Sequence, residues 1–207
     1  MDGTGVIARH KRGVAGVLAG LALLLSPTRA AAHLVTTGMG PVYDGIGHLL
    51  LTPEDLVPVL ALALYAGLRG AVAGRRAMFL LPLAWFLGGI AGLSVDGAAS
   101  LPIPVVSLLV LGGLVAADLC MPPVAITVLA VVLGIAHGFL NGAVLKGGAG
   151  TLGLLGIMSV VFIVMSLATA LVVSLRRPWV RIAVRVAGSW VCAIGLLMLG
   201  WLVKGHM

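Results

Sequence analysis

The residue with the most distinctive chemistry is His33, which directly follows the small residues Ala30, Ala31 and Ala32. A basic stretch and an apolar run precede these alanines, and that order is typical of a secretory signal peptide with its cleavage site. Cleavage after Ala32 would make His33 the first residue of the mature chain. Its α-amine, which titrates near neutral pH, and its ring could then bind the same metal ion.

Two pairs of histidine and carboxylate residues could complete a metal site with this terminus. Asp44 and His48 are four residues apart, so on a helix their side chains lie on one face about one turn apart. Asp96 and His137 come from other parts of the chain but are expected at the same membrane level. Imidazole with carboxylate suits nickel, cobalt, zinc or copper better than calcium. We therefore predict a metal site made of His33, Asp44, His48, Asp96 and His137.

Three further polar residues are expected as accessory groups of this site, namely Glu54, Asp55 and Asn141. The two acids follow Thr52 and Pro53. A threonine cap, a proline at the first helical position and acids in the first turn are typical of a helix start. Glu54 and Asp55 therefore also have a purely structural explanation, in which they only balance the positive end of a helix.

Simpler roles remain open for other members of the set too. Asp44 can cap a short helix, and Asp96 can stabilise a tight turn. His48 and His137 are harder to explain in this way, because ionisable residues at membrane depth usually face a bundle interior or a water-filled cavity. These two histidines therefore favour a functional interpretation.

The chain that must position these residues is 61% hydrophobic and only 9% charged over 207 residues, which is typical of an integral membrane protein. The 30 glycines predict close helix packing at small-residue faces such as those around Gly88, Gly112 and Gly195. Apolar runs between Gly, Pro and charge clusters predict six transmembrane helices, at about 53–69, 77–94, 102–118, 123–141, 151–175 and 181–203.

The predicted fold is therefore an all-α integral membrane protein with a cleaved signal peptide. Residues 1–32 form the signal, and residues 33–207 form a single polytopic membrane domain. The stretch before residue 52 is too polar to span and predicts a short interfacial helix on the outer face. An uncleaved first membrane helix is the alternative to the signal peptide.

The distribution of basic residues predicts the orientation in a bacterial-type inner membrane. Short loops on the cytoplasmic side of multi-pass proteins carry an excess of Lys and Arg. With both termini of the mature chain on the outer, periplasmic side, seven arginines fall in the cytoplasm and two lysines outside: Arg69, Arg75, Arg76, Arg176, Arg177, Arg181 and Arg185, against Lys146 and Lys204. These residues flank membrane spans and form no patch with interleaved aromatic residues, which excludes a nucleic-acid-binding protein.

The order of these elements resembles the HupE/UreJ family of small membrane proteins, regarded as nickel or cobalt permeases and as accessory proteins for hydrogenase and urease. The similarity lies in Ala32-His33 at the mature start, in Gly45-Ile46-Gly47-His48, and in His137-Gly138-Phe139. The family commonly has Gly-x-Asp-His at the first span, where this sequence has Thr52-Pro53-Glu54-Asp55.

The resemblance implies that His33, His48 and His137 bind metal and that Glu54 or Asp55 takes the place of the family's acid. It favours nickel or cobalt as the ion, with zinc or copper as alternatives. The function that follows is a divalent-metal permease or a metal-delivery membrane protein rather than an enzyme. Its partners would be the metal ion and the lipid bilayer, and the resemblance leaves room for a metalloenzyme-maturation partner and for a homo-oligomer.

Two other functions remain open from the residues alone. One is a membrane-embedded metal-dependent hydrolase, in which the ion activates water near a lipid-like substrate and Asp96 or Glu54 acts as the base. The sequence has no nucleophile motif and no His-Glu-x-x-His signature to support it. The other is a metal-free structural subunit, which explains the glycines but not the uneven placement of the acids and histidines.

The proposed role of the terminal amine can be tested directly. A chain that keeps residues before His33 should bind metal much more weakly than the cleaved chain, because its α-nitrogen is then an amide that no longer chelates. N-terminal sequencing and a metal titration on the same purified sample would measure this. Equal affinities for the two forms would remove the His33 amine from the ligand set.

Overall fold

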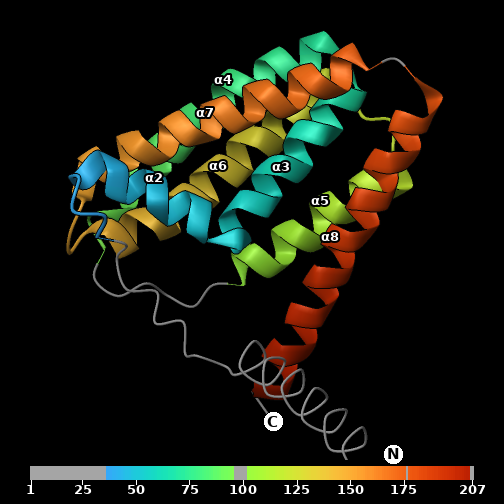
Figure 1. The fold of residues 1–207 in the computed structure, drawn as a ribbon. Coiled ribbons are helices and arrows are strands. Elements are labelled where there is room, and N and C mark those ends of the chain that lie inside the picture. The colour runs from blue at the N-terminus through green and yellow to red at the C-terminus, as the bar shows by residue number, and fades with distance from the viewer. Residues whose placement is uncertain (1–35, 96–101, 176, 206–207) are drawn as a thin grey trace, which may run out of the picture. The chain divides into compact units, whose positions relative to one another are not determined.

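The computed structural model describes residues 36–95, 102–175 and 177–205, and within them the chain is helical and contains no strand. Contacts divide the chain into residues 1–33 and Leu34–Met207, and the described helices belong to the second unit. They are α2 (Pro41–Leu51), α3 (Pro53–Leu68), α4 (Ala71–Gly92), α5 (Ile103–Ala117), α6 (Pro123–Leu145), α7 (Gly150–Ser174) and α8 (Pro178–Gly205) (Figure 1). The predicted signal peptide, His33 and Asp96 lie outside the described residues.

The all-α prediction is confirmed, and a helix occupies each of the six predicted ranges. Helices α4, α6, α7 and α8 are each long and apolar enough to cross a membrane. Helix α5 is apolar but shorter, and α2 and α3 meet at a bend of 75° around Thr52, so that together they could form one broken span. The predicted interfacial helix corresponds to α2. The number of crossings stays a prediction.

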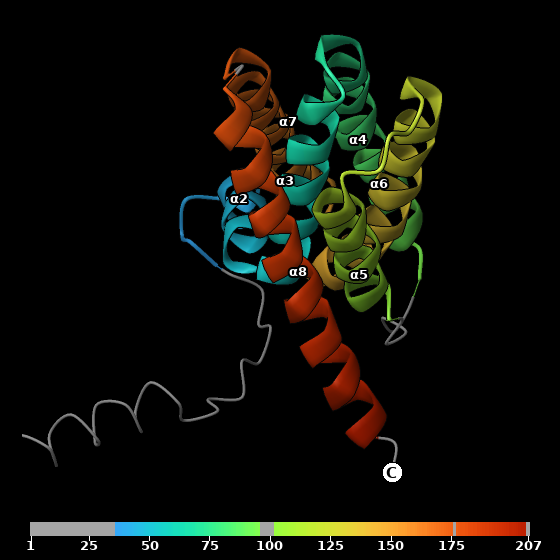
Figure 2. The same ribbon diagram turned by 90° about the vertical axis from the view of Figure 1, so that its right-hand side faces the viewer.

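Glycines bring the helices into close contact, as their number predicts. Gly88 and Gly92 on α4 face the backbone of α6, where a methyl group on either would lie well inside van der Waals contact with the carbonyl of Ile135 or Phe139. Gly112 on α5 faces the backbone of α8 in the same way. Figure 2 shows α5 and α8 side by side, with α4 and α6 packed together beside them. Backbone-to-backbone packing of this kind needs small residues at the interface.

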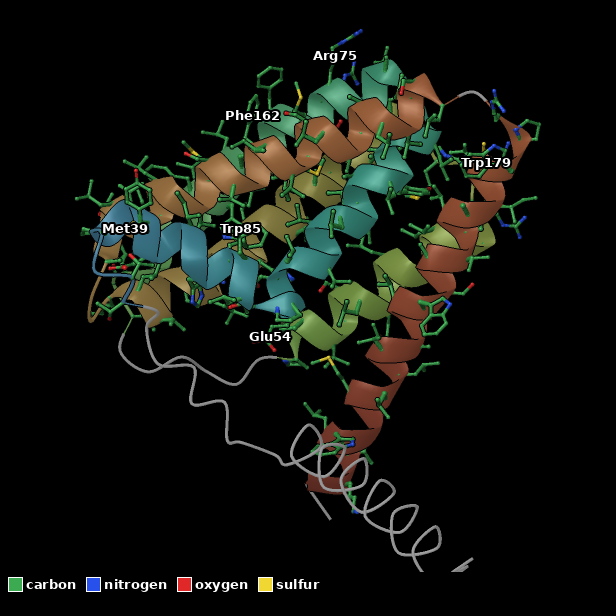
Figure 3. The ribbon with its side chains drawn as sticks, in the orientation of Figure 1. Met39, Glu54, Arg75, Trp85, Phe162 and Trp179 are labelled. Carbon is green, nitrogen blue, oxygen red and sulfur yellow. The ribbon has the colours of Figure 1, made fainter. Side chains whose placement is uncertain are left out.

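The chain reverses its direction between α3 and α4, and the two ends of the bundle carry different charged residues (Figure 1). The turn between α3 and α4 consists of Arg69 and Gly70, and Gly70 has φ +99°, which favours glycine. Figure 3 shows Arg75 at this end and Glu54 at the opposite end. The acids and histidines at the start of α3 and the end of α6 are thereby separated from the arginines by the length of the bundle.

A substitution at Gly88 tests the importance of this packing. Gly88→Ala should lower the free energy of unfolding by about 1–3 kcal/mol, because the added methyl group forces α4 away from the backbone of α6. The matched control is Gly113→Ala on α5, where a Cβ meets nothing within 4 Å. Both can be measured by unfolding in mixed detergent micelles. Equal stability of the two variants would contradict the packing argument.

Candidate metal-binding site

The carboxylate of Asp55 is buried in the first turn of α3, with only 4% of the residue exposed. Its Oδ1 lies 2.6 Å from Nδ1 of His137, and its Oδ2 accepts a hydrogen bond of 2.8 Å from Nδ2 of Asn141. His137 and Asn141 are four residues apart on α6 and so present both groups from one helix face. Both oxygens of the buried carboxylate are therefore hydrogen-bonded, which is what burial of a charge in an apolar bundle requires.

The other ring nitrogen of His137 connects the site to a third helix. Nε2 lies 3.0 Å from Oγ of Ser107 on α5, and this hydroxyl can also donate to the carbonyl of Pro104 at 2.9 Å. Because a hydroxyl has one hydrogen, Ser107 can donate either to Nε2 of a neutral histidine or to Pro104. In the second arrangement a protonated His137 donates from both ring nitrogens. The same heavy-atom positions thus satisfy both protonation states of the ring.

Two buried polar atoms in this region have no hydrogen-bond partner within the described residues. They are Oδ1 of Asn141 and Nε1 of Trp85. The ring of Trp85 is fully buried on α4, and its centroid lies 5.3 Å from that of His137. A buried group without a partner is costly, so each can pair with a further ligand or a water molecule, Trp85 Nε1 as a donor and Asn141 Oδ1 as an acceptor. Asn141 Oδ1 is the free acceptor next to the carboxylate.

The remaining predicted ligands lie around this centre. His48, near the end of α2, is buried and lies within electrostatic range of Asp55. Exposed Glu54 lies within electrostatic range of both Asp55 and His137. Asp44 instead accepts hydrogen bonds from the amide and the hydroxyl of Thr37, and so holds the segment that leads into α2.

The predicted five-residue site is only partly described by the structure. His33 and Asp96 lie outside the described residues, and Asp44 is engaged with Thr37. Among the residues that the structure does describe, no three His, Cys, Asp or Glu side chains converge closely enough to hold a metal ion. The five-ligand site therefore stays a prediction.

The sequence pattern predicted only an accessory role for Asp55, which lies at the centre of these hydrogen bonds. It gave no role in the site to Trp85 or Ser107. A helix start explains the position of Asp55 in the sequence but not its burial, which depends on where α6 packs. The spacing of His137 and Asn141, one turn apart on an apolar helix, is the available sequence signal for a shared partner.

One of the comparisons with known proteins identifies the family of this chain. The family model described as HupE / UreJ protein matches residues 21–198. The chain belongs to the HupE/UreJ family. No curated protein and no solved structure matches it. The HupE/UreJ family comprises multi-pass membrane proteins of nickel or cobalt transport, or accessory proteins linked to urease and hydrogenase maturation, and its members are not known as enzymes.

Removing the Asp55 carboxylate tests whether it organises the site of this HupE/UreJ protein. Asp55→Ala should lower the free energy of unfolding by about 3 kcal/mol, because it leaves His137 and Asn141 buried without their shared acceptor. Glu54→Ala, at the neighbouring exposed position, is the matched control and should change stability little. Unfolding in mixed micelles measures both. If both substitutions lowered the free energy of unfolding equally, Asp55 would contribute no more than any acid at a helix start, and the site argument would fail.

Proposed function

We propose that this protein is a permease for a divalent transition metal, nickel or cobalt, and that Asp55 and His137 form its internal metal-binding station. The observation that supports this proposal is the burial of a fully hydrogen-bonded carboxylate and imidazole pair inside an apolar bundle. Ionisable residues in the interior of membrane proteins mark the paths of ions and substrates more often than they serve packing. Membership of a family associated with nickel and cobalt supports a transition metal as the ion.

The contacts of Asp55 suit a histidine that binds metal through Nε2. A carboxylate next to Nδ1 favours the proton on that nitrogen and leaves the lone pair of Nε2 available for an ion. Ser107 Oγ and the unpaired Oδ1 of Asn141 are oxygen donors close to the pair. Nitrogen with oxygen donors suits nickel or cobalt, and no cysteine takes part that would select cuprous copper.

The two hydrogen arrangements at Ser107 suggest how the station empties. When His137 is protonated, Nε2 has no lone pair for an ion, and the hydroxyl of Ser107 donates to Pro104 instead. Loss of that proton restores the lone pair without any change in the positions of the heavy atoms. Metal and proton therefore compete for one nitrogen, and we propose that their exchange accompanies transport.

Capture of the ion is assigned to the predicted outer residues. We propose that His33, Asp44, His48 and Asp96 collect the ion on the periplasmic side and pass it to His137. His48 supports this route, because it is a buried histidine within electrostatic range of Asp55. Asp44, which already accepts two hydrogen bonds from Thr37, would bind metal only after releasing them.

Metal delivery without transport is the second candidate. Its support is the apolar character of α3 beyond the site, where Val59, Leu62 and Ala66 are fully buried towards the arginine end. A binding protein needs no polar path past these residues, whereas a permease needs a transient one. Under this alternative the ion would return to the periplasmic side and pass to a partner protein.

Transport and delivery can be separated with proteoliposomes that contain a trapped fluorescent metal indicator. The wild-type protein should admit nickel or cobalt, and His137→Gln and His48→Ala should each reduce uptake by at least about tenfold, because a lost ligand removes several kcal/mol of binding. Ser166→Ala is the control, since within the described residues this partly exposed hydroxyl bonds the carbonyl of Phe162 on its own helix, α7.

A binding titration on the same samples completes this experiment. Tight binding without uptake would support delivery and contradict the permease. Wild-type uptake by His137→Gln would remove His137 from the path.

A further inference from the structure

A cavity of about 490 Å³ opens between the α3–α4 turn and the α7–α8 connection, at the end of the bundle opposite the metal station. Arg177 and Arg181 contribute its charged groups. Its other walls are apolar and include Leu68, Val172 and Val180. A charged side next to an apolar wall suits a ligand with an anionic head and a hydrocarbon body.

The charges around the cavity are only partly balanced. Asp118 accepts hydrogen bonds from both Arg69 and Arg181, and so a single carboxylate serves two guanidinium groups. The side chain of Arg181 remains 59% exposed and bonds Asp118 through Nε alone within the described part of the chain. Arg177 is exposed and has no acidic partner there. The cavity therefore retains positive charge that a bound anion would neutralise.

The guanidinium groups and the adjacent end of α4 both suit a bound phosphate. The planar guanidinium group binds the oxygens of a phosphate in pairs and loses less on leaving water than an ammonium group does. The first turn of α4, which opens into the cavity at Ala71 after Gly70, adds the positive end of a helix.

The residues around the cavity are of the kinds that occur at the level of lipid headgroups. Figure 3 shows Arg75 and Trp179 at the same end of the bundle as the cavity, away from Glu54. Arginine clusters and an exposed tryptophan at the ends of membrane helices are typical of the headgroup level. The distribution of basic residues predicts that this end faces the cytoplasm, where the leaflet is rich in anionic lipid.

We propose that this cavity binds the phosphate group of an anionic membrane lipid through Arg177 and Arg181. The apolar wall of Leu68, Val172 and Val180 receives the start of an acyl chain. The lipid connects the α3–α4 turn to the first turn of α8. It supplements the ion pairs of Asp118, which already join Arg69 of the α3–α4 turn to Arg181 of α8.

Native mass spectrometry of the full chain, released from a neutral detergent with added phosphatidylglycerol, tests this proposal. The wild-type protein should retain the lipid, and Arg177→Gln should weaken its retention by about tenfold, because one charge-assisted contact is lost. Arg75→Gln is the matched control, since Arg75 is an exposed arginine at the same end of the bundle but outside the cavity wall. Phosphatidylcholine, which has the same phosphate without net charge, should be retained weakly by every variant.

A second variant separates loss of binding from loss of folding. Ala71→Asp places an acid in the first turn of α4, where it stabilises the helix but repels a bound phosphate. It should keep the thermal stability of the wild type and still lose the lipid. Equal retention by Arg177→Gln and the wild type, or of phosphatidylcholine and phosphatidylglycerol, would overturn the proposal. Displacement of the lipid by an equal concentration of inorganic phosphate would identify a free-phosphate site and overturn it as well.

Discussion

A carboxylate buried among apolar helices constrains the rest of this structure. Asp55 has no bulk water to solvate its charge, and an unpaired ion in such a place costs several kcal/mol. Its two oxygens must therefore meet donors, and both donors come from α6, one turn apart. His137 extends the network to Ser107 on α5. One charge thus requires three helices to meet within hydrogen-bonding distance, and the remaining packing has to permit that approach.

The face of α6 that permits it is made of glycine. Gly134, Gly138 and Gly142 recur every fourth residue and lie against the backbone of α4. His137 and Asn141 each precede one of these glycines by a single residue, so they point about 100° away around the helix, towards α3 and α5. The close approach of α4 also brings the buried ring of Trp85 beside the imidazole. The glycines let α4 approach one side of α6, and the polar residues meet α3 and α5 on another side, so both spacings are needed for the site.

This coupling explains which features the sequence could predict. Hydropathy and breaker residues located the helices because membrane spans carry long, uniform signals. The start of α4 differs from its predicted position because the run Ala71 to Arg76 is helical despite its charges. Hydrogen bonds between helices carry no such signal. Asp55 in its own sequence context has the pattern of a helix start, and only the packing of α6 against α3 shows that it is a buried acceptor. The contact of Asp44 with Thr37 is local, yet the sequence spacing, which pairs Asp44 with His48, gives no sign of it, and a metal-binding role for Asp44 stays a prediction.

The two ends of the bundle use charge in different ways, and the difference bears on the permease hypothesis. At the arginine end Asp118 is held by two guanidinium groups, which remain charged at any physiological pH. At the other end Asp55 is paired with an imidazole, whose nitrogens can bind a metal ion. A guanidinium group can hold helices together but has no lone pair for a metal ion, whereas an imidazole can do both. The proposed ion site therefore lies at a contact whose side chains can bind a metal ion, and the guanidinium pairs lie at the opposite end of the bundle.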